Sequence, residues 1–292
     1  NASRQSARFI GKAGLLVTLA AVGIAVDERL FSVEDSIYQY LPEFRAFFDD
    51  EPSKKNIRIR DLLTHRSGLS WNEIVPLWVV ENGEIVPNQR NTLVQMRASD
   101  DWVSFTLERR LTNIGRYQFC TANGVLLAKI LENASGVTFE KYIQERLFAP
   151  LEIIHPPIGQ DQAGNSNGGD GYILSLLDLT KIGFLFLKRG VWKGRTLVNN
   201  NFAKDAMSRD FQFSQSATEN SIGYFFTFFG SGIQPLLNIP YSEIVFFVSE
   251  DGSALFIAPE EDMVASIFSE NPFGFNFPAG YSLFAEITRT IR

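Results

Sequence analysis

Hydrophobic and polar positions divide the chain into a helix-rich first part and a strand-rich last part. In the first part, apolar residues recur at helical spacing or fill nearly all sides of a segment, and glycine or proline often ends the run. The pattern predicts helices over Ser6–Arg29, Asp35–Leu41, Ile57–Leu63, Asp101–Arg110, Ala122–Ala134, Thr138–Phe148, Ser175–Lys188, Asn199–Arg209 and Tyr281–Ile291.

The last part of the chain carries short β-branched or aromatic runs that turn residues separate. These runs predict antiparallel strands at Gly223–Phe229, Glu243–Ser249, Ala254–Ala258 and Met263–Ser269. Helices followed by a block of strands favour an α+β fold. Segments 71–101 and 155–170 show few periodic signals and are expected to be irregular. We expect one domain over 1–292, with a helical subdomain at roughly 30–210 and a sheet region at roughly 220–292 that includes the helix at 6–29.

Composition narrows the class of protein. Of 292 residues, 45% are hydrophobic, which suits a soluble globular chain with a sizeable core. The net charge of −6 argues against a nucleic-acid partner. The longest apolar run, Ala13–Val26, is too short to predict a transmembrane segment. One cysteine, Cys120, excludes an internal disulfide, and with only two histidines no zinc site is expected. No motif for a cofactor is present, and nothing indicates a compartment.

Five segments in chain order carry a resemblance to a known family. They are Gly23–Glu28 with Tyr40–Phe44, Ile59–Leu69 (IRDLLTHRSGL), Leu126–Leu151, Gly168–Leu197 and Phe256–Pro259. Together they resemble the serine β-lactamase and penicillin-binding-protein family, in its esterase and D-aminopeptidase (CubicO-like) branch. The resemblance implies an antiparallel sheet flanked by helices, an all-α subdomain, and a cleft between them.

The chemistry that the resemblance implies is acyl transfer by a serine. A Ser-x-x-Lys pair opens the buried helix, so that a lysine one helical turn away helps to deprotonate the hydroxyl. Registered on Gly23, this chain has Lys12 at the position of the nucleophile and Leu15 at the position of the lysine. No Ser-x-x-Lys occurs anywhere in the sequence. Its nearest formal relative, Thr138–Lys141, is interpreted as a solvated helix face.

Two further family motifs also differ here. The tyrosine motif falls at 117–123 and places Phe119 where the catalytic tyrosine would be and Thr121 at its polar third position. Tyr117 carries a phenol two residues earlier, and we interpret it as a packed aromatic. The Lys-or-His-x-Gly element falls at 250–252 and has Glu250, which would repel an anionic substrate. These replacements predict that the acyl-enzyme mechanism is absent.

Other candidate motifs have ordinary structural interpretations. Gly164–Gly168 fits Gly-x-Ser-x-Gly, but it lies in a polar loop without the strand and helix that a nucleophile elbow needs. We expect a structural hydrogen-bonding role for His65 and a surface position for His155. The acidic cluster Glu260–Asp262 is expected in a solvated turn.

Three functions stay open from the sequence. The first is a degenerate family member whose cleft holds a small-molecule, peptide or protein partner, with a Lys12–Glu250 salt bridge filling the former centre. The second is a serine hydrolase whose nucleophile is misplaced by the register or precedes the sequence. The third is a non-hydrolytic enzyme that uses Lys12 and Glu250 as an acid/base pair. Family members also have an N-terminal β-hairpin, which we expect to be lacking here. The sheet edge near Met263–Ser269 is then predicted either to pair with another chain in an oligomer or to be covered by a segment that precedes this sequence.

Overall fold

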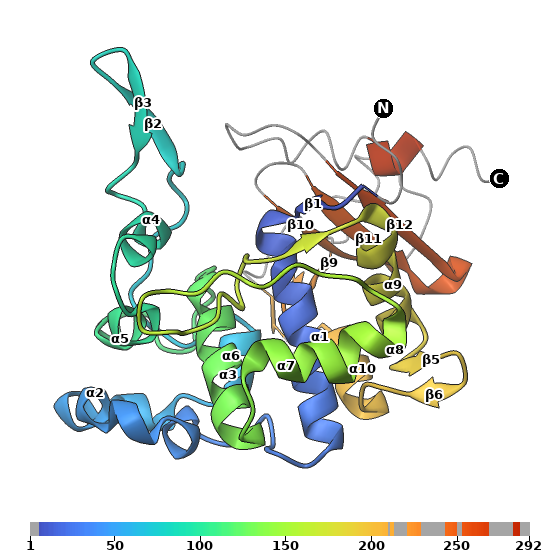
Figure 1. Ribbon diagram of the computed structural model, residues 1–292, viewed down its shortest axis with the longest axis horizontal. Coiled ribbons are helices and arrows are strands. Elements are labelled where there is room, and N and C mark those ends of the chain that lie inside the picture. Colours follow the sequence, from blue (N-terminus) through green and yellow to red (C-terminus); the bar gives the residue numbers. More distant parts are fainter. Residues whose placement is uncertain are drawn as a thin grey trace.

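A computed structural model describes residues 6–209, 211–212, 221–228, 243–249, 253–268 and 283–286 (Figure 1). The helices are α1 (Leu15–Asp27), α2 (Arg45–Asp50), α3 (Ile59–Leu63), α4 (Thr92–Arg97), α5 (Trp102–Leu107), α6 (Ala122–Ser135), α7 (Phe139–Ile143), α8 (Ala149–Leu151), α9 (Leu176–Leu187) and α10 (Asn200–Ala206). Tighter or wider turns are η1 (Gly11–Gly14), η2 (Ile37–Tyr40), η3 (Pro42–Phe44), η4 (Pro52–Asn56), η5 (Gln144–Phe148) and η6 (Pro259–Glu261). The strands are β1 (Arg8–Phe9), β2 (Trp78–Glu81), β3 (Glu84–Pro87), β4 (Ile173–Leu174), β5 (Val191–Trp192), β6 (Arg195–Thr196), β7 (Phe211–Gln212), β8 (Ser221–Ile222), β9 (Thr227–Phe228), β10 (Val245–Val248), β11 (Ala254–Ala258) and β12 (Met263–Ile267).

The main sheet is antiparallel, in the order β12-β11-β10-β9-β8-β7. Its central strands are apolar on both faces because both faces are covered. Leu255 of β11 packs toward α9, where Gly183 leaves room for it. On the opposite face, Phe256 stacks on Phe284 of the helical segment 283–286 at a centroid distance of 4.2 Å. The sheet therefore lies between α9 and the chain's last described helical residues, as the α+β prediction requires.

Helix α1 lies at the centre of the molecule, where the sheet meets the helical part (Figure 1). Its residues Leu15–Ala25 are all buried. Gly14 and Gly23 allow close contacts, because a Cβ there would meet Tyr172 and Val198 within 2.6 Å. Thr18 donates a hydrogen bond to the carbonyl of Gly168 and contacts the hydroxyl of Tyr172. A helix with apolar residues on nearly all sides is thus buried over most of its length, as expected from its sequence.

The structure corrects several element predictions. The helix expected from Ser6 begins only at Gly11, because Arg8–Phe9 instead pair with Ile173–Leu174 as β1 and β4. The segment expected to be irregular at 71–101 contains the hairpin β2–β3 and helix α4. Its turn, Asn82-Gly83, has φ of 52° and 86°, the geometry of a two-residue hairpin turn. The run at 223–229 is broken by a bend at Phe225, whose φ is +55°.

The edge strand of the main sheet bears on the prediction of an oligomer. Strand β12 is the last in the strand order, and within the described ranges it pairs with β11 alone. Oligomerisation through this edge stays a prediction.

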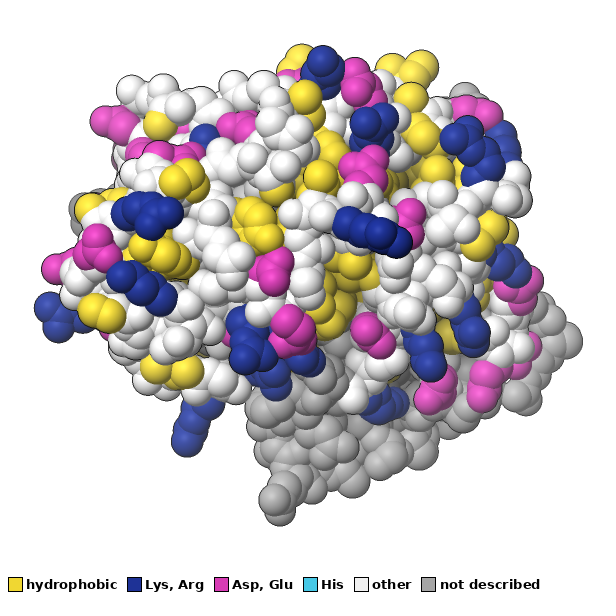
Figure 2. All heavy atoms as spheres, turned by 90° about the horizontal axis from the view of Figure 1, so that it is seen from below, with side chains coloured by type: hydrophobic (Ala, Val, Ile, Leu, Met, Phe, Trp, Pro, Cys, Tyr) yellow, Lys and Arg dark blue, Asp and Glu magenta, His cyan; other side chains and the backbone are white. Residues whose placement is uncertain are grey.

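Among the described helices, none has the length and the hydrophobicity that crossing a membrane would require. On the face shown in Figure 2, basic and acidic side chains alternate, and hydrophobic side chains appear only in small patches.

Candidate functional site

The turn before helix α1 brings residue 12 into the interior. Gly11 has a φ of +54°, and a Cβ at this position would lie 2.9 Å from Oγ of Ser249, which follows β10. The turn η1 is therefore pressed against the end of the central strand. Lys12 follows at once and is only 6% exposed. The side chain of Lys12 therefore does not extend into solvent.

Lys12 forms a buried ion pair. Its Nζ lies 3.0 Å from Oε1 of Glu73, and the two side chains are 7% and 1% exposed. Glu73 also accepts hydrogen bonds from Nε1 of Trp71 at 2.5 Å and from the backbone N–H and hydroxyl of Thr121 at 2.6 and 2.9 Å. A buried carboxylate is tolerated when its oxygens are satisfied in this way. Glu73 thus joins the start of α1 to the start of α6.

The family-equivalent positions named from the sequence gather around this ion pair, with one gap. The ring centroid of Phe119 lies 5.1 Å from Nζ of Lys12, within the range of a cation–π contact. Thr121 binds Glu73 at the N-terminus of α6, and Leu15 is completely buried in α1. Glu250 lies outside the described residues, so the Lys12–Glu250 salt bridge stays a prediction.

A buried histidine forms the wall behind Phe119. The imidazole of His65 packs against Phe119 and Phe225, at centroid distances of 4.6 and 5.0 Å. Its Nδ1 accepts a hydrogen bond from the backbone N–H of Cys120 and contacts the amide of Asn123. Burial, and then the positive charge of Lys12, lower the pKa of His65 to about 3. The ring is therefore neutral at physiological pH and has the structural role expected from the sequence.

Two further titratable groups near the centre, Tyr117 and Cys120, are held in their neutral forms. Burial and the carboxylate of Glu73 raise the pKa of the Tyr117 phenol and of the Cys120 thiol. Neither a phenolate nor a thiolate is therefore available as a base or nucleophile at neutral pH. In the described ranges, no three side chains of the kinds that bind metals cluster to form a metal site.

Glu73 belongs to this site although no sequence pattern predicted it. It stands in a segment without periodic pattern, directly after the block that ends at Leu69. Its partner Lys12 is 61 positions away, so no local spacing could connect them. The one available signal was a lysine in an otherwise apolar run, because a buried ammonium requires an anion within reach.

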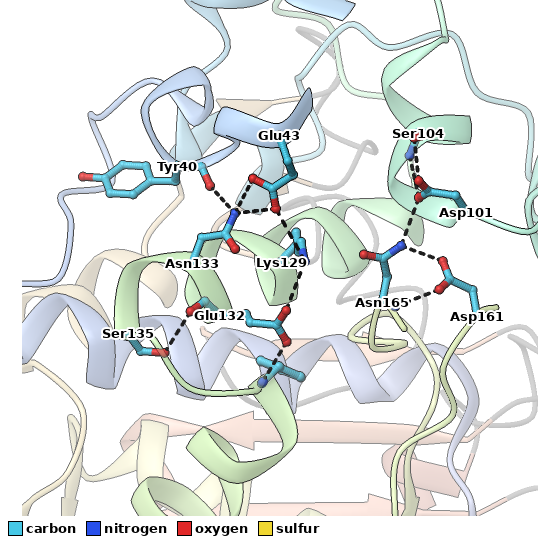
Figure 3. A network of polar contacts seen from close by, with 11 residues as sticks. Tyr40, Glu43, Asp101, Ser104, Lys129, Glu132, Asn133, Ser135, Asp161 and Asn165 are labelled. Carbon is cyan, nitrogen blue, oxygen red and sulfur yellow. Dashed lines mark hydrogen bonds and ion pairs between the residues drawn. The ribbon is translucent and has the colours of Figure 1, made fainter. Parts of the chain in front are cut away.

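The Gly-x-Ser-x-Gly match at 164–168 belongs to a loop that polar side chains hold together (Figure 3). The amide of Asn165 donates to Asp101 at 2.9 Å and to Asp161 at 2.8 Å. Ser166 is buried, and its hydroxyl has no hydrogen-bond partner among the residues the structure describes. A nucleophile elbow presents an exposed hydroxyl between a strand and a helix, and this loop has neither feature.

The other motifs also have structural roles. Thr138 caps helix α7 by accepting a hydrogen bond from the backbone N–H of Lys141. His155 is half-buried, which corrects the expected surface position. Its ring stacks on Phe148 at 5.1 Å, and its Nε2 accepts a hydrogen bond from the backbone of Ile173. The acidic residues 260–262 lie in an exposed turn after β11, as expected.

Comparison with known proteins gives a consistent family. A family model described as Beta-lactamase matches residues 16–277, a range that begins directly after Leu15. The 6-aminohexanoate-dimer hydrolase of Paenarthrobacter ureafaciens is 24% identical over 192 residues, which are 64% of this chain and 47% of that protein. The chain spans less than half the length of the curated relatives that it matches.

Two solved structures share the fold. EstCE1, described as a hydrolase with promiscuous acyltransferase activity, superposes with a TM-score of 0.73 at 13% identity over 98% of this chain and 85% of that one. The putative 6-aminohexanoate-dimer hydrolase from Bacillus anthracis has a TM-score of 0.73 at 14% identity, covering 99% of this chain and 74% of that one. At these identities the likeness concerns the architecture.

Proposed function

The chain belongs to the beta-lactamase family, and on that premise we propose that it uses the family cleft to bind a ligand or partner without serine acyl transfer. The observation that carries the proposal is the Lys12–Glu73 ion pair, with its 3.0 Å separation and almost complete burial. The sequence register assigns Lys12 to the position of the family's nucleophile, and an ammonium group paired with a carboxylate cannot attack a carbonyl there, because a protonated amine has no free electron pair.

The residues around Lys12 support the same proposal. Leu15 has no proton to exchange, and Phe119 offers a ring face where a phenol would assist proton transfer. The Nδ1 of His65 accepts a hydrogen bond from the backbone of Cys120, and burial lowers the pKa of the ring, which makes it a weak base. A hydrophobic and ion-paired centre at these positions supports a cleft that binds without acylating.

A covalent probe tests the absence of acylation. The chain is incubated with a fluorophosphonate and, separately, with a chromogenic β-lactam and a chromogenic ester, and its intact mass is measured. An active serine esterase in the same experiment shows that the reagents work. We expect no adduct and no turnover above the buffer rate. A stoichiometric adduct on a serine would refute the proposal.

Binding is tested with a panel of small esters, amides and short peptides. A ligand that binds the native state raises the melting temperature by mass action. We expect Phe119→Leu, which removes the ring beside Lys12, to abolish the shift. Ile154→Ser, which changes a 92% exposed side chain, should retain it. A shift that both variants retain equally would place the binding site elsewhere.

The alternative function is a serine hydrolase, and the hydrolases among the relatives favour it. It requires a nucleophile at a position other than 12. A non-hydrolytic enzyme is a further alternative, in which Lys12 exchanges a proton with a carboxylate at the centre. The adduct experiment distinguishes the first alternative from the proposal. A Glu73→Gln variant with unchanged ligand binding but altered turnover would favour the second.

A further inference from the structure

The charges of the Lys12–Glu73 pair cancel at the centre. The ammonium group of Lys12 and the carboxylate of Glu73 lie 3.0 Å apart, and their side chains are only 7% and 1% exposed. Because the two groups are buried together, they act on a neighbouring ligand as a closed pair and not as two separate charges. A ligand beside this pair therefore meets no net charge from it.

The other titratable groups described at the centre add no charge. Burial, and then the positive charge of Lys12, lower the pKa of His65 to about 3, so its ring is neutral. Burial raises the pKa of the Tyr117 phenol and of the Cys120 thiol, so both groups keep their protons. The side chains described at this centre thus present no excess of either sign.

The loop that packs against the centre is balanced as well. Gly169 lies so close to Thr121 that a Cβ on Gly169 would approach the carbonyl oxygen of Thr121 to 2.6 Å. The next residue, Asp170, is buried, forms an ion pair with Arg97 and accepts a hydrogen bond from the amide of Asn167. The negative charge that this loop brings toward the centre is therefore matched by a cation.

Aromatic rings form one wall of the centre. Phe119 is half-buried, and its ring centroid lies 5.1 Å from Nζ of Lys12 and 4.6 Å from the ring of His65. Phe225 packs against the same imidazole at 5.0 Å. The exposed part of Phe119 thus belongs to a ring that its neighbours hold in place. A flat apolar group packs well against such a ring.

The backbone behind this wall is strained. His65 and Phe225 have φ values of +54° and +55°, and this left-handed region is unusual for a bulky residue such as phenylalanine. Hydrogen bonds hold both residues there, since the N–H of Phe225 donates to the carbonyl of Leu63 at 2.7 Å and the N–H of Gln118 donates to the carbonyl of His65 at 2.8 Å. Strained residues concentrate at active sites and ligand clamps, so the strain favours a binding role for the wall.

We infer that the ligand of this cleft is an uncharged molecule with a flat aromatic group, which packs against Phe119 beside the Lys12–Glu73 pair. The inference rests on the proposed binding function and names the class of ligand. An anionic ligand is disfavoured because the ammonium group of Lys12 already has an anion, and the ligand would stand near the carboxylate of Glu73. A cationic ligand is disfavoured because that carboxylate is already paired.

Benzamide and benzoate test the inference, because they have nearly the same shape and differ in charge. The binding of each to the unmodified chain is measured by isothermal titration calorimetry at pH 6. We expect benzamide to bind at least about tenfold more tightly, since the carboxylate of Glu73 opposes a second anion. Benzoate that binds as tightly as benzamide would overturn the inference, and so would the absence of binding by both probes.

Charge variants of the ion pair provide the matched comparison. Glu73→Gln removes one negative charge beside Lys12, so the preference for benzamide over benzoate should decrease about tenfold. Lys12→Met/Glu73→Gln removes both charges and should restore the preference of the unmodified chain. A preference that Glu73→Gln leaves unchanged, or that the double variant does not restore, contradicts the inference. Circular dichroism verifies the fold of each variant, and the comparison on the unmodified chain stands without them.

The flat group is tested separately at Phe119. Cyclohexanecarboxamide carries the same amide on a puckered ring and should bind the unmodified chain severalfold more weakly than benzamide. Phe119→Leu should weaken benzamide to the level of cyclohexanecarboxamide or below, whereas Ile154→Ser, at a 92% exposed side chain, should retain the difference. A difference that Phe119→Leu retains would place the aromatic group elsewhere and overturn the inference.

Failure of this inference is distinguishable from failure of the proposed function. If benzoate binds as tightly as benzamide and no serine adduct forms, the cleft still binds without acylation, and only the inference on ligand charge falls. A serine adduct refutes the proposed function whatever the charge of the molecule that binds.

Discussion

The buried ion pair at the centre predicts a large and coupled effect on stability. Replacing Lys12 by methionine removes the ammonium group but keeps most of the side chain's volume. At 3.0 Å and an effective dielectric constant of about 20, the lost attraction is about 5 kcal/mol, part of which is offset because Lys12 no longer has to be desolvated. Glu73 keeps its hydrogen bonds from Trp71 and Thr121, so we expect the free energy of unfolding to fall by about 3 kcal/mol, at the low end for a broken buried pair.

A double-mutant cycle measures the coupling. Lys12→Met, Glu73→Gln and the combined variant are unfolded in urea. The loss of unfolding free energy in the combined variant should be smaller than the sum of the two single losses by about 2 kcal/mol or more. The exposed pair Lys55–Asp49 is the control. It has an N–O distance of 2.7 Å, but its side chains are 36% and 64% exposed, and its removal should leave stability almost unchanged. A coupling below about 0.5 kcal/mol between Lys12 and Glu73 would contradict the reasoning.

Three further predictions concern other buried groups. Because the pKa of His65 is about 3 in the folded chain and near 6.5 when unfolded, stability should fall as the pH decreases below 6.5, by about 2 kcal/mol between pH 6.5 and 5. Urea unfolding at both pH values should show that His65→Gln, with His155 unchanged, lacks this part of the decrease. Gly124→Ala should destabilise the chain, because the new Cβ would lie 2.5 Å from the carbonyl oxygen of Gly168. The melting temperature should fall by several degrees, at roughly 2–4 °C per kcal/mol of lost stability. A melting temperature equal to that of the unmodified chain would argue against this contact. Cys120, buried and with a raised thiol pKa, should react with a disulfide reagent only in denaturant, and rapid labelling of the native chain would contradict its described environment.

The sequence predicted those parts of the fold that local patterns determine. Helix α6 was expected at Ala122–Ala134 and is found at Ala122–Ser135, since apolar spacing and the glycine at 136 mark both its face and its end. Strand β11 agrees residue for residue, because its apolar run lies between turn residues. The hairpin β2–β3 was missed although its Asn-Gly turn is a strong signal, because its strands are apolar without alternation and prolines stand at both ends.

The candidate site was predictable only in part. The register on Gly23 selected Lys12 and the tyrosine motif at 117–123 selected Phe119, and the structure places these two side chains in contact. Glu73 and His65 reach the same centre from a different segment, and the contacts between these elements depend on tertiary packing. The expected surface position of His155 was wrong for the same reason, since the stacking on Phe148 arises only when the loop folds back.

The way Glu73 is held also bears on how easily this chain could change its chemistry. Its carboxylate is buried beside Lys12, so a codon change that places serine at position 12 first removes a cation from an anion that has no access to water. The intermediate is a less stable protein before any new activity exists. Changing position 73 first has the same cost, because it leaves the ammonium group of Lys12 buried without this anion. The ion pair thus acts as an evolutionary barrier, in which two distant codons must change together.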